Sequence, residues 1–195
     1  MRKQIYITLL TGLILGLLLA PSYAMSDLAE RFLLSSRAIG QPSQLEKWDK
    51  NDLRMAAIEV LDEIEAGRYD KWPTVFCLNS LGMAQYVVDI PRITAYKDDM
   101  IYVVLDSLRG FPHKDAIEFQ LKYVADKEVT VREIAIKGLA KIDFMKLQDA
   151  RKWHSAILAS FEKAKKSEKV DWMKKDLDTA ISTVKSAKLP PVKQK

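Results

Sequence analysis

Few side chains in this 195-residue sequence have the types and spacing of a catalytic or metal site. The two histidines, His113 and His154, stand 41 residues apart, and the single cysteine, Cys77, lies in an apolar stretch. Zinc sites on helices use ligands that are close in the sequence, such as His-x-x-x-His or Cys-x-x-Cys. A reactive thiol needs a neighbouring base or cation, and the residues beside Cys77 supply neither. We therefore expect a buried, inert thiol and no zinc site.

Two groups of carboxylates are the other candidates for chemistry. Asp62, Glu63 and Glu65 crowd the end of one predicted helix, and Asp98 and Asp99 form a pair. Paired carboxylates can act as acid and base or bind calcium, but the sequence lacks the spacing of an EF-hand loop. It also lacks a Gly-rich phosphate loop and a Gly-x-Ser-x-Gly motif. We interpret these carboxylates as solvated surface groups and expect no catalytic residue, metal or cofactor.

Tryptophan and lysine near the C-terminus mark a candidate binding surface. Trp172 lies near the edge of the apolar face of its predicted helix, among lysines. A tryptophan with a basic rim is frequent at contact surfaces, although a tryptophan at a helix edge also covers hydrophobic cores. The candidate surface consists of Trp172, Lys169, Lys174, Lys175, Trp153, Lys163 and Lys166.

The charge of the chain is unevenly distributed. Residues 25–145 carry 16 basic and 20 acidic side chains, a net charge of −4, whereas residues 146–195 carry 13 basic and 6 acidic ones, a net charge of +7. Such a separation can orient a protein against an acidic partner or an anionic surface. The alternative is an ordinary solvated helix face that is rich in lysine.

Residues 1–24 have the three parts of a secretory signal peptide. Arg2 and Lys3 begin the segment, Ile5–Leu19 is apolar, and small residues precede a cleavage point after Ala24. The alternative is an uncleaved membrane anchor, but a spanning helix needs about 20 apolar residues and this run has 15. No cysteine stands at the cleavage point, where a lipoprotein would carry its lipid, which excludes a lipoprotein. We expect a mature protein that is not integral to the membrane, and its single thiol favours the periplasm over a disulfide-rich secreted domain.

The mature chain shows the three- and four-residue apolar spacing of amphipathic helices. We therefore predict one all-α domain over residues 25–188 and a disordered basic tail over residues 189–195. The predicted helices are Ser26–Ile39, Asn51–Ala66, Pro73–Val88, Asp98–Arg109, His113–Ala125, Thr130–Ile142, Gln148–Lys166 and Glu168–Ala187.

Glycine and capping residues add detail to this pattern. Gly82 and Gly138 fall inside predicted helices, which indicates a close approach to another helix at each position. Thr130 and Glu133 have the spacing of a capping box, in which a hydroxyl and a carboxylate cap the first turn of a helix reciprocally. This spacing predicts that a helix begins directly after Thr130.

Two predicted helices match each other at an offset of 78 residues. Leu53–Ile64 aligns with Val131–Ile142, with Arg, Ala, Ile, Leu and Ile at equivalent places. The offset is about twice the repeat length of HEAT proteins, and residues 116–142 resemble a HEAT-like repeat with Asp126 at the turn and Arg132 early in the second helix.

The HEAT-like resemblance implies a fold and a role for these residues. It implies antiparallel helical hairpins stacked as a short α-solenoid with a protein-binding surface. It also implies that Asp126, Arg132 and the equivalent Arg54 are structural and hold one turn against the next. The alternative fold is an irregular helical bundle, because the same spacing of arginine, alanine and leucine is common in amphipathic helices.

These features favour an exported, non-enzymatic helical-repeat protein that acts as a protein–protein interaction module for an envelope or periplasmic partner. The alternative is peripheral binding to an anionic envelope surface through the basic helices of residues 148–188. A third hypothesis is an enzyme built from scattered carboxylates, since HEAT-like relatives that handle bilin chromophores exist. Export and the modest net charge argue against nucleic acid as the partner.

Overall fold

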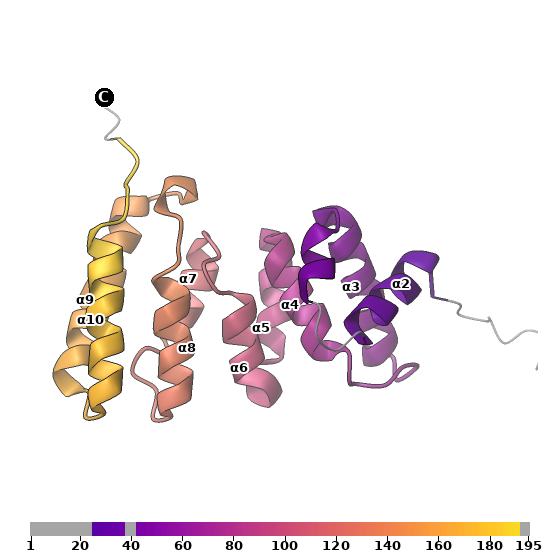
Figure 1. The fold of residues 1–195 in the computed structure, drawn as a ribbon, viewed down its shortest axis with the longest axis horizontal. Helices are drawn as coiled ribbons and strands as arrows, with labels where there is room; N and C mark the ends of the chain where they lie inside the picture. Colours follow the sequence, from indigo (N-terminus) through magenta and orange to yellow (C-terminus); the bar gives the residue numbers. More distant parts are fainter. Residues whose placement is uncertain (1–24, 38–41, 192–195) are drawn as a thin grey trace, which may run out of the picture.

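The computed structural model describes residues 25–37 and 42–191 (Figure 1). These residues form nine α-helices, three short 3₁₀ helices and no β-strand, which confirms the all-α prediction. The predicted signal peptide, residues 1–24, and the last four residues of the predicted tail lie outside the described residues. Among the helices of the described ranges, none is both long and apolar enough to cross a membrane.

The helices follow one another in chain order along the long axis of the molecule (Figure 1). The α-helices are α2 (Asp27–Arg37), α3 (Lys50–Glu65), α4 (Thr74–Ala84), α5 (Ile90–Ala95), α6 (Lys97–Ser107), α7 (Lys114–Leu121), α8 (Val129–Leu139), α9 (Ala150–Ser167) and α10 (Asp171–Lys185). The 3₁₀ helices are η1 (Pro42–Lys47), η2 (Val87–Asp89) and η3 (Phe144–Lys146).

Each of the eight predicted helices corresponds to an observed α-helix, but the region after α4 differs from the prediction. Gln85 adopts a left-handed conformation with φ of 58° and ends α4 at Ala84, short of the predicted Val88. No helix is predicted over residues 89–97, whereas Pro91 lies in the first turn of α5. A proline is tolerated there because the first N–H groups of a helix have no intrahelical acceptor.

The predicted capping box of α8 is wrong. The helix begins at Val129, so that Thr130 lies inside its first turn, and its N-cap residue is Glu128. Glu133 forms an ion pair with Lys137 instead of reaching back to the start of the helix. The turn is held by Asp126, whose carboxylate accepts a hydrogen bond from the backbone N–H of Glu128 at 2.9 Å.

Successive helices pack on each other, and a second set of contacts runs along the molecule. α2 packs on α3, α3 on α4, α4 on α6, α7 on α8, and α9 on α10. In addition, α8 lies against both α6 and α10, and α7 lies against α9 (Figure 1). Because α8 packs on α10, the turn that precedes α8 lies beside the turn that precedes α10.

The hairpin of α7 and α8 contributes to two hydrophobic cores. Ala116 and Ala135 belong to a core that extends over α2–α6. Their neighbours in the sequence, Ile117 and Ile136, belong to a second core shared with α9 and α10. Adjacent residues on an α-helix point about 100° apart, so this one hairpin covers both cores and joins them.

Two glycines allow the close helix contacts that the sequence predicts. A Cβ atom at Gly82 of α4 would meet the carbonyl oxygen of Ser107 at the end of α6. A Cβ atom at Gly138 of α8 would meet the side-chain oxygen of Gln120, which is completely buried. The amide nitrogen of Gln120 donates to the carbonyl oxygen of Leu108 at 3.1 Å. The backbone carbonyl at Ser107 has little room to move, so the contact at Gly82 requires glycine.

We predict that Gly82→Ala lowers the free energy of unfolding by about 1–3 kcal/mol, because the added methyl group overpacks the contact between α4 and α6. Urea denaturation followed by circular dichroism measures this loss. Ser182→Ala, at an exposed position of α10, is the control and should change the free energy by less than about 0.5 kcal/mol. Equal stability of Gly82→Ala and the control would contradict the close contact.

Candidate functional site

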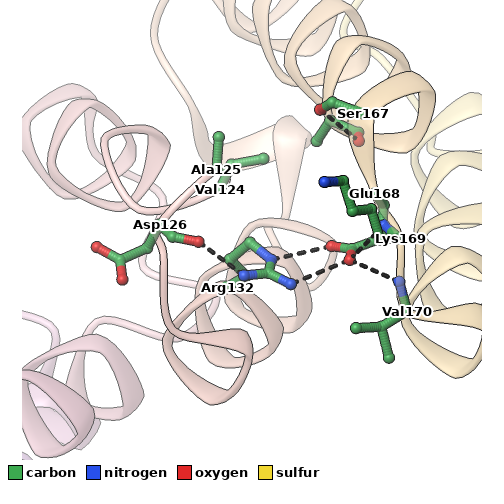
Figure 2. Close-up of a pocket in the computed structure, with 9 residues that line it drawn as sticks. Val124, Ala125, Asp126, Arg132, Ser167, Glu168, Lys169 and Val170 are labelled. Carbon is green, nitrogen blue, oxygen red and sulfur yellow. Dashed lines mark hydrogen bonds and ion pairs between the residues drawn. The ribbon is translucent and has the colours of Figure 1, made fainter.

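A pocket of about 240 Å³ lies between the turn that precedes α8 and the turn that precedes α10 (Figure 2). It is formed where residues about 40 positions apart in the chain are brought together by the packing of α8 on α10. The residues that line it are Val124, Ala125, Asp126, Arg132, Ala164, Ser167, Glu168, Lys169 and Val170.

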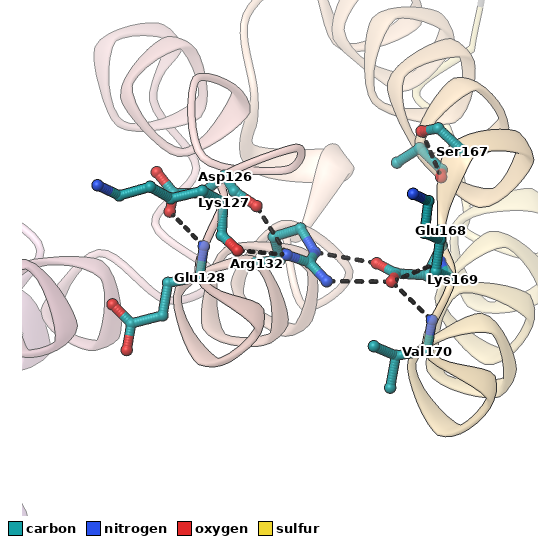
Figure 3. A network of polar contacts seen from close by, with 9 residues as sticks. Asp126, Lys127, Glu128, Arg132, Ser167, Glu168, Lys169 and Val170 are labelled. Atoms are coloured by element: carbon teal, nitrogen blue, oxygen red, sulfur yellow. Dashed lines mark hydrogen bonds and ion pairs between the residues drawn. The ribbon is translucent and has the colours of Figure 1, made fainter.

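A bidentate ion pair between Arg132 and Glu168 spans this pocket (Figure 3). Arg132 Nε and Nη2 donate to the two carboxylate oxygens at 2.9 and 3.0 Å. Nη1 donates to the backbone carbonyl oxygen of Asp126 at 2.7 Å. The two side chains are only 13% and 6% exposed. Arg132 therefore fastens its own preceding turn and, at the same time, the turn between α9 and α10.

The carboxylate of Glu168 accepts hydrogen bonds from several donors. It also accepts the backbone N–H groups of Lys169 at 2.9 Å and Val170 at 3.0 Å. Burial raises the pKa of Glu168. The N–H of Val170, the Arg132 guanidinium and the N–H of Lys169 together have a larger effect in the opposite direction, so the pKa lies below its ordinary value. A carboxylate that accepts this many hydrogen bonds is stabilised in its charged form, as the partner of an ion pair.

The groups left for a ligand are at the rim of the pocket. The ammonium group of Lys169 has no side-chain partner among the described residues, and one carboxylate oxygen of Asp126 accepts the N–H of Glu128. The hydroxyl of Ser167 donates to the carbonyl oxygen of Ala164. A pocket with aliphatic walls and one cation and one anion at its rim can bind a small group.

Arg54 repeats this arrangement in the first half of the chain. Its Nε and Nη2 donate to the carboxylate of Asp89 at 2.7 and 2.8 Å, and its guanidinium lies 5.2 Å from the centre of the Tyr86 ring. Arg54 and Asp89 are 35 residues apart, and Arg132 and Glu168 are 36 apart. The two arginines hold equivalent places in the matching segments. The sequence does not predict their acidic partners, Asp89 and Glu168, because no local pattern connects residues so far apart.

The predicted contact residues divide into an exposed group and a buried one. Trp172 is 46% exposed at the start of α10. Of the predicted contact lysines, those that are exposed and have no ion-pair partner in the described part of the chain are Lys163, Lys166, Lys169 and Lys175. We call Trp172, Lys169 and Lys175 the Trp172 surface.

Two predicted contact residues do not belong to this surface. Lys174 forms an ion pair with Asp171 at 3.2 Å. Trp153 is only 7% exposed and belongs to the core of α7–α10, with the ammonium group of Lys152 4.9 Å from its ring. Trp153 must therefore be removed from the predicted contact surface, because its ring covers the core and cannot reach a partner.

The thiol and the histidines have structural contacts. Cys77 is completely buried, as the sequence predicts, and burial raises the pKa of its thiol to about 12. His113 Nδ1 accepts the backbone N–H of Asp115 at 3.3 Å and caps α7. His154 Nε2 lies 2.9 Å from the carbonyl oxygen of Val184, to which it donates. None of the three side chains contacts another of them.

The acidic cluster at the end of α3 is paired with arginines. Arg92 reaches Asp62 at 2.7 Å and Glu65 at 3.0 Å, and Arg68 binds Glu63 through two hydrogen bonds. These carboxylates are therefore partners in ion pairs that connect α3 to the following segments. Within residues 25–37 and 42–191, no group of three or more His, Cys, Asp or Glu side chains is arranged to hold a metal ion.

Comparisons with protein-family models, with curated proteins and with solved structures find no match for this chain. The interpretation of the pocket and of the Trp172 surface therefore depends on their own geometry.

We predict that Arg132→Ala lowers the free energy of unfolding by about 3 kcal/mol, because it leaves the buried carboxylate of Glu168 unpaired. Urea denaturation at pH 7 measures the loss. Lys165→Ala is the control, since it breaks the exposed pair with Asp178 and should cost less than about 1 kcal/mol. Equal losses in the two variants would contradict the role of the buried pair.

The same pair predicts a dependence of stability on pH. Because the pKa of Glu168 is lowered in the folded state, its contribution is present above the ordinary glutamate pKa of about 4.3. The contribution is lost as the pH falls through the folded-state value. Glu168→Gln should therefore be less stable than the wild type at pH 7, and the difference should shrink on acidification. A difference that stays constant down to pH 3 would exclude this linkage.

Proposed function

We propose that this chain is an exported, non-enzymatic helical-repeat protein that binds an envelope or periplasmic protein through the Trp172 surface. In this proposal the signal peptide is cleaved after Ala24. The hairpins α2–α3, α4–α6, α7–α8 and α9–α10 stack as a short HEAT-like α-solenoid that presents the Trp172 surface at one end.

The packing of the hairpins supports a stacked arrangement. In a helical-repeat protein each unit buries its apolar faces against the units before and after it. The α7–α8 hairpin contributes to two cores in this way. The Arg54–Asp89 and Arg132–Glu168 pairs support the proposal independently, because equivalent arginines of matching helices bind carboxylates at nearly the same separation.

The first two residues after the proposed cleavage point make contacts with the rest of the domain. Ser26 lies two residues after Ala24, and its backbone N–H donates to the carboxylate of Glu59 at 2.6 Å. Met25 packs against the core of α2–α6. A mature chain that begins at Met25 would therefore keep every one of these contacts.

The exposure of Trp172 is the observation that carries the proposal. The chain has four tryptophans, and Trp172 is the one that is exposed, whereas Trp48 and Trp72 are partly buried and Trp153 is buried. Leaving a tryptophan ring in water forfeits a large hydrophobic contribution, and tryptophans dominate the binding energy of many interfaces. Lys169 and Lys175 beside it favour a partner with acidic residues around an apolar anchor site.

We predict that Trp172→Ala weakens binding of the partner at least about tenfold, because interface tryptophans often contribute 2 kcal/mol or more. The assay is crosslinking and capture from envelope extract with protein purified from cells that express the full chain. Lys175→Glu should weaken capture, whereas Lys122→Glu, the same charge change at the exposed C-cap of α7, should not. Repeated capture of no protein, or capture that is equal for Trp172→Ala and the wild type, would refute the proposal.

The net charge of +7 over residues 146–195 supports a second candidate, peripheral binding to an anionic envelope surface. We predict co-sedimentation with phosphatidylglycerol vesicles at low salt and at least about tenfold weaker binding at 0.5 M salt, where the Debye length falls to a few ångströms. Phosphatidylcholine vesicles are the control. Absence of binding, or binding that does not respond to salt, would remove this candidate.

A further inference from the structure

A second exposed apolar surface lies in the first half of the chain, where α3 meets η2. It consists of Met55, Val87 and Val88, and we call it the Met55 patch. All three side chains are exposed, and Val88 is 70% exposed. Single exposed apolar residues are common on proteins, but adjacent ones mark sites of interaction.

Two contacts bring the parts of the Met55 patch together. The Tyr86 hydroxyl donates to the side-chain oxygen of Asn51, one turn before Met55 on α3. The Arg54–Asp89 ion pair closes the other side of the η2 segment. Residues four apart on a helix lie on the same face, so Met55 lies on the face of α3 that meets η2. The ion pair and the hydrogen bond position the segment that carries Val87 and Val88, whose side chains stay exposed to water beside Met55.

The surroundings of the Met55 patch have the opposite charge to those of the Trp172 surface. On the face of α3 that carries Met55, Asp52 lies three residues before it and Glu59 four residues after it. Residues 25–145 have a net charge of −4 against +7 for residues 146–195. Each surface therefore has an apolar centre, and the two charged rims are complementary. Such complementarity accelerates encounter and fixes the orientation of the partner.

A single copy cannot bring these two surfaces together. α3 lies toward one end of the long axis and α10 lies at the other (Figure 1). A contact between two different surfaces of the same chain is heterologous, so each added copy leaves one free surface of each kind. Growth by such contacts gives a ring or an open chain.

We propose that the Trp172 surface of one copy docks on the Met55 patch of a second copy and produces head-to-tail association. This inference relies on the proposed function, in which the Trp172 surface is a contact surface, and it names a second copy of the chain as the occupant. The Trp172 ring would cover Met55 and Val88, while Lys169 and Lys175 would face Asp52 and Glu59 of α3.

Sedimentation equilibrium of protein purified from cells that express the full chain tests this proposal. The average mass of the wild type should rise with concentration at low salt, and association should require at least about tenfold more protein at 0.5 M salt. Val88→Asp and Trp172→Ala should each be monomeric. Met145→Asp, which alters an exposed apolar residue elsewhere, is the control and should associate like the wild type.

Mixing the two monomeric variants gives the decisive result. Val88→Asp keeps a functional Trp172 surface and Trp172→Ala keeps a functional Met55 patch, so the mixture should form a 1:1 dimer and nothing larger. A mixture that stays monomeric, association that survives either substitution, or a wild type that is monomeric up to about 1 mM would overturn the proposal.

The outcomes separate this inference from the proposed function. If the wild type does not self-associate but Trp172→Ala abolishes capture of an envelope protein, the head-to-tail contact is refuted and the proposed function stands. If Trp172→Ala affects neither self-association nor capture, both are refuted.

Discussion

The buried ion pair between Arg132 and Glu168 is the interaction on which the second half of the structure depends. Removing two charges from water is costly, and the cost is recovered only when every donor and acceptor finds a partner. Here the guanidinium also binds the carbonyl oxygen of Asp126, and the carboxylate also accepts backbone N–H groups of its own turn. The pair therefore fixes two turns with one set of charges, and the pocket exists because those turns cannot move apart.

The pairing of Arg54 with Asp89 shows the same solution in the first half of the chain. There the pair holds η2 against α3, and the exposed apolar side chains of Met55, Val87 and Val88 lie beside it. In both halves an ion pair between a helix and a later segment fixes the position of the exposed side chains around it. The Met55 patch flanks the Arg54–Asp89 pair, and Lys169 of the Trp172 surface directly follows Glu168.

The sequence predicts the helices well and the pairs poorly. Helical periodicity is local, so the eight predicted helices are all present. Helix α5 is not predicted, because six residues that include a proline are too short to show a clear helical period. The arginines could be found from the internal match, but Asp89 and Glu168 could not, since the packing of helices decides which carboxylate each arginine meets. Trp153 was separable from Trp172 by spacing alone: it lies four residues before buried Ile157.

The hairpin of α7 and α8, which belongs to both cores, also governs how the molecule comes apart. Separate cores allow the two ends of an elongated protein to unfold independently when the unit between them contributes little. Here loss of the central hairpin would strip one wall from each core at once. The cooperativity of unfolding therefore depends on about 26 residues, 114–139. Loss of packing in one core is passed to the other core through this hairpin.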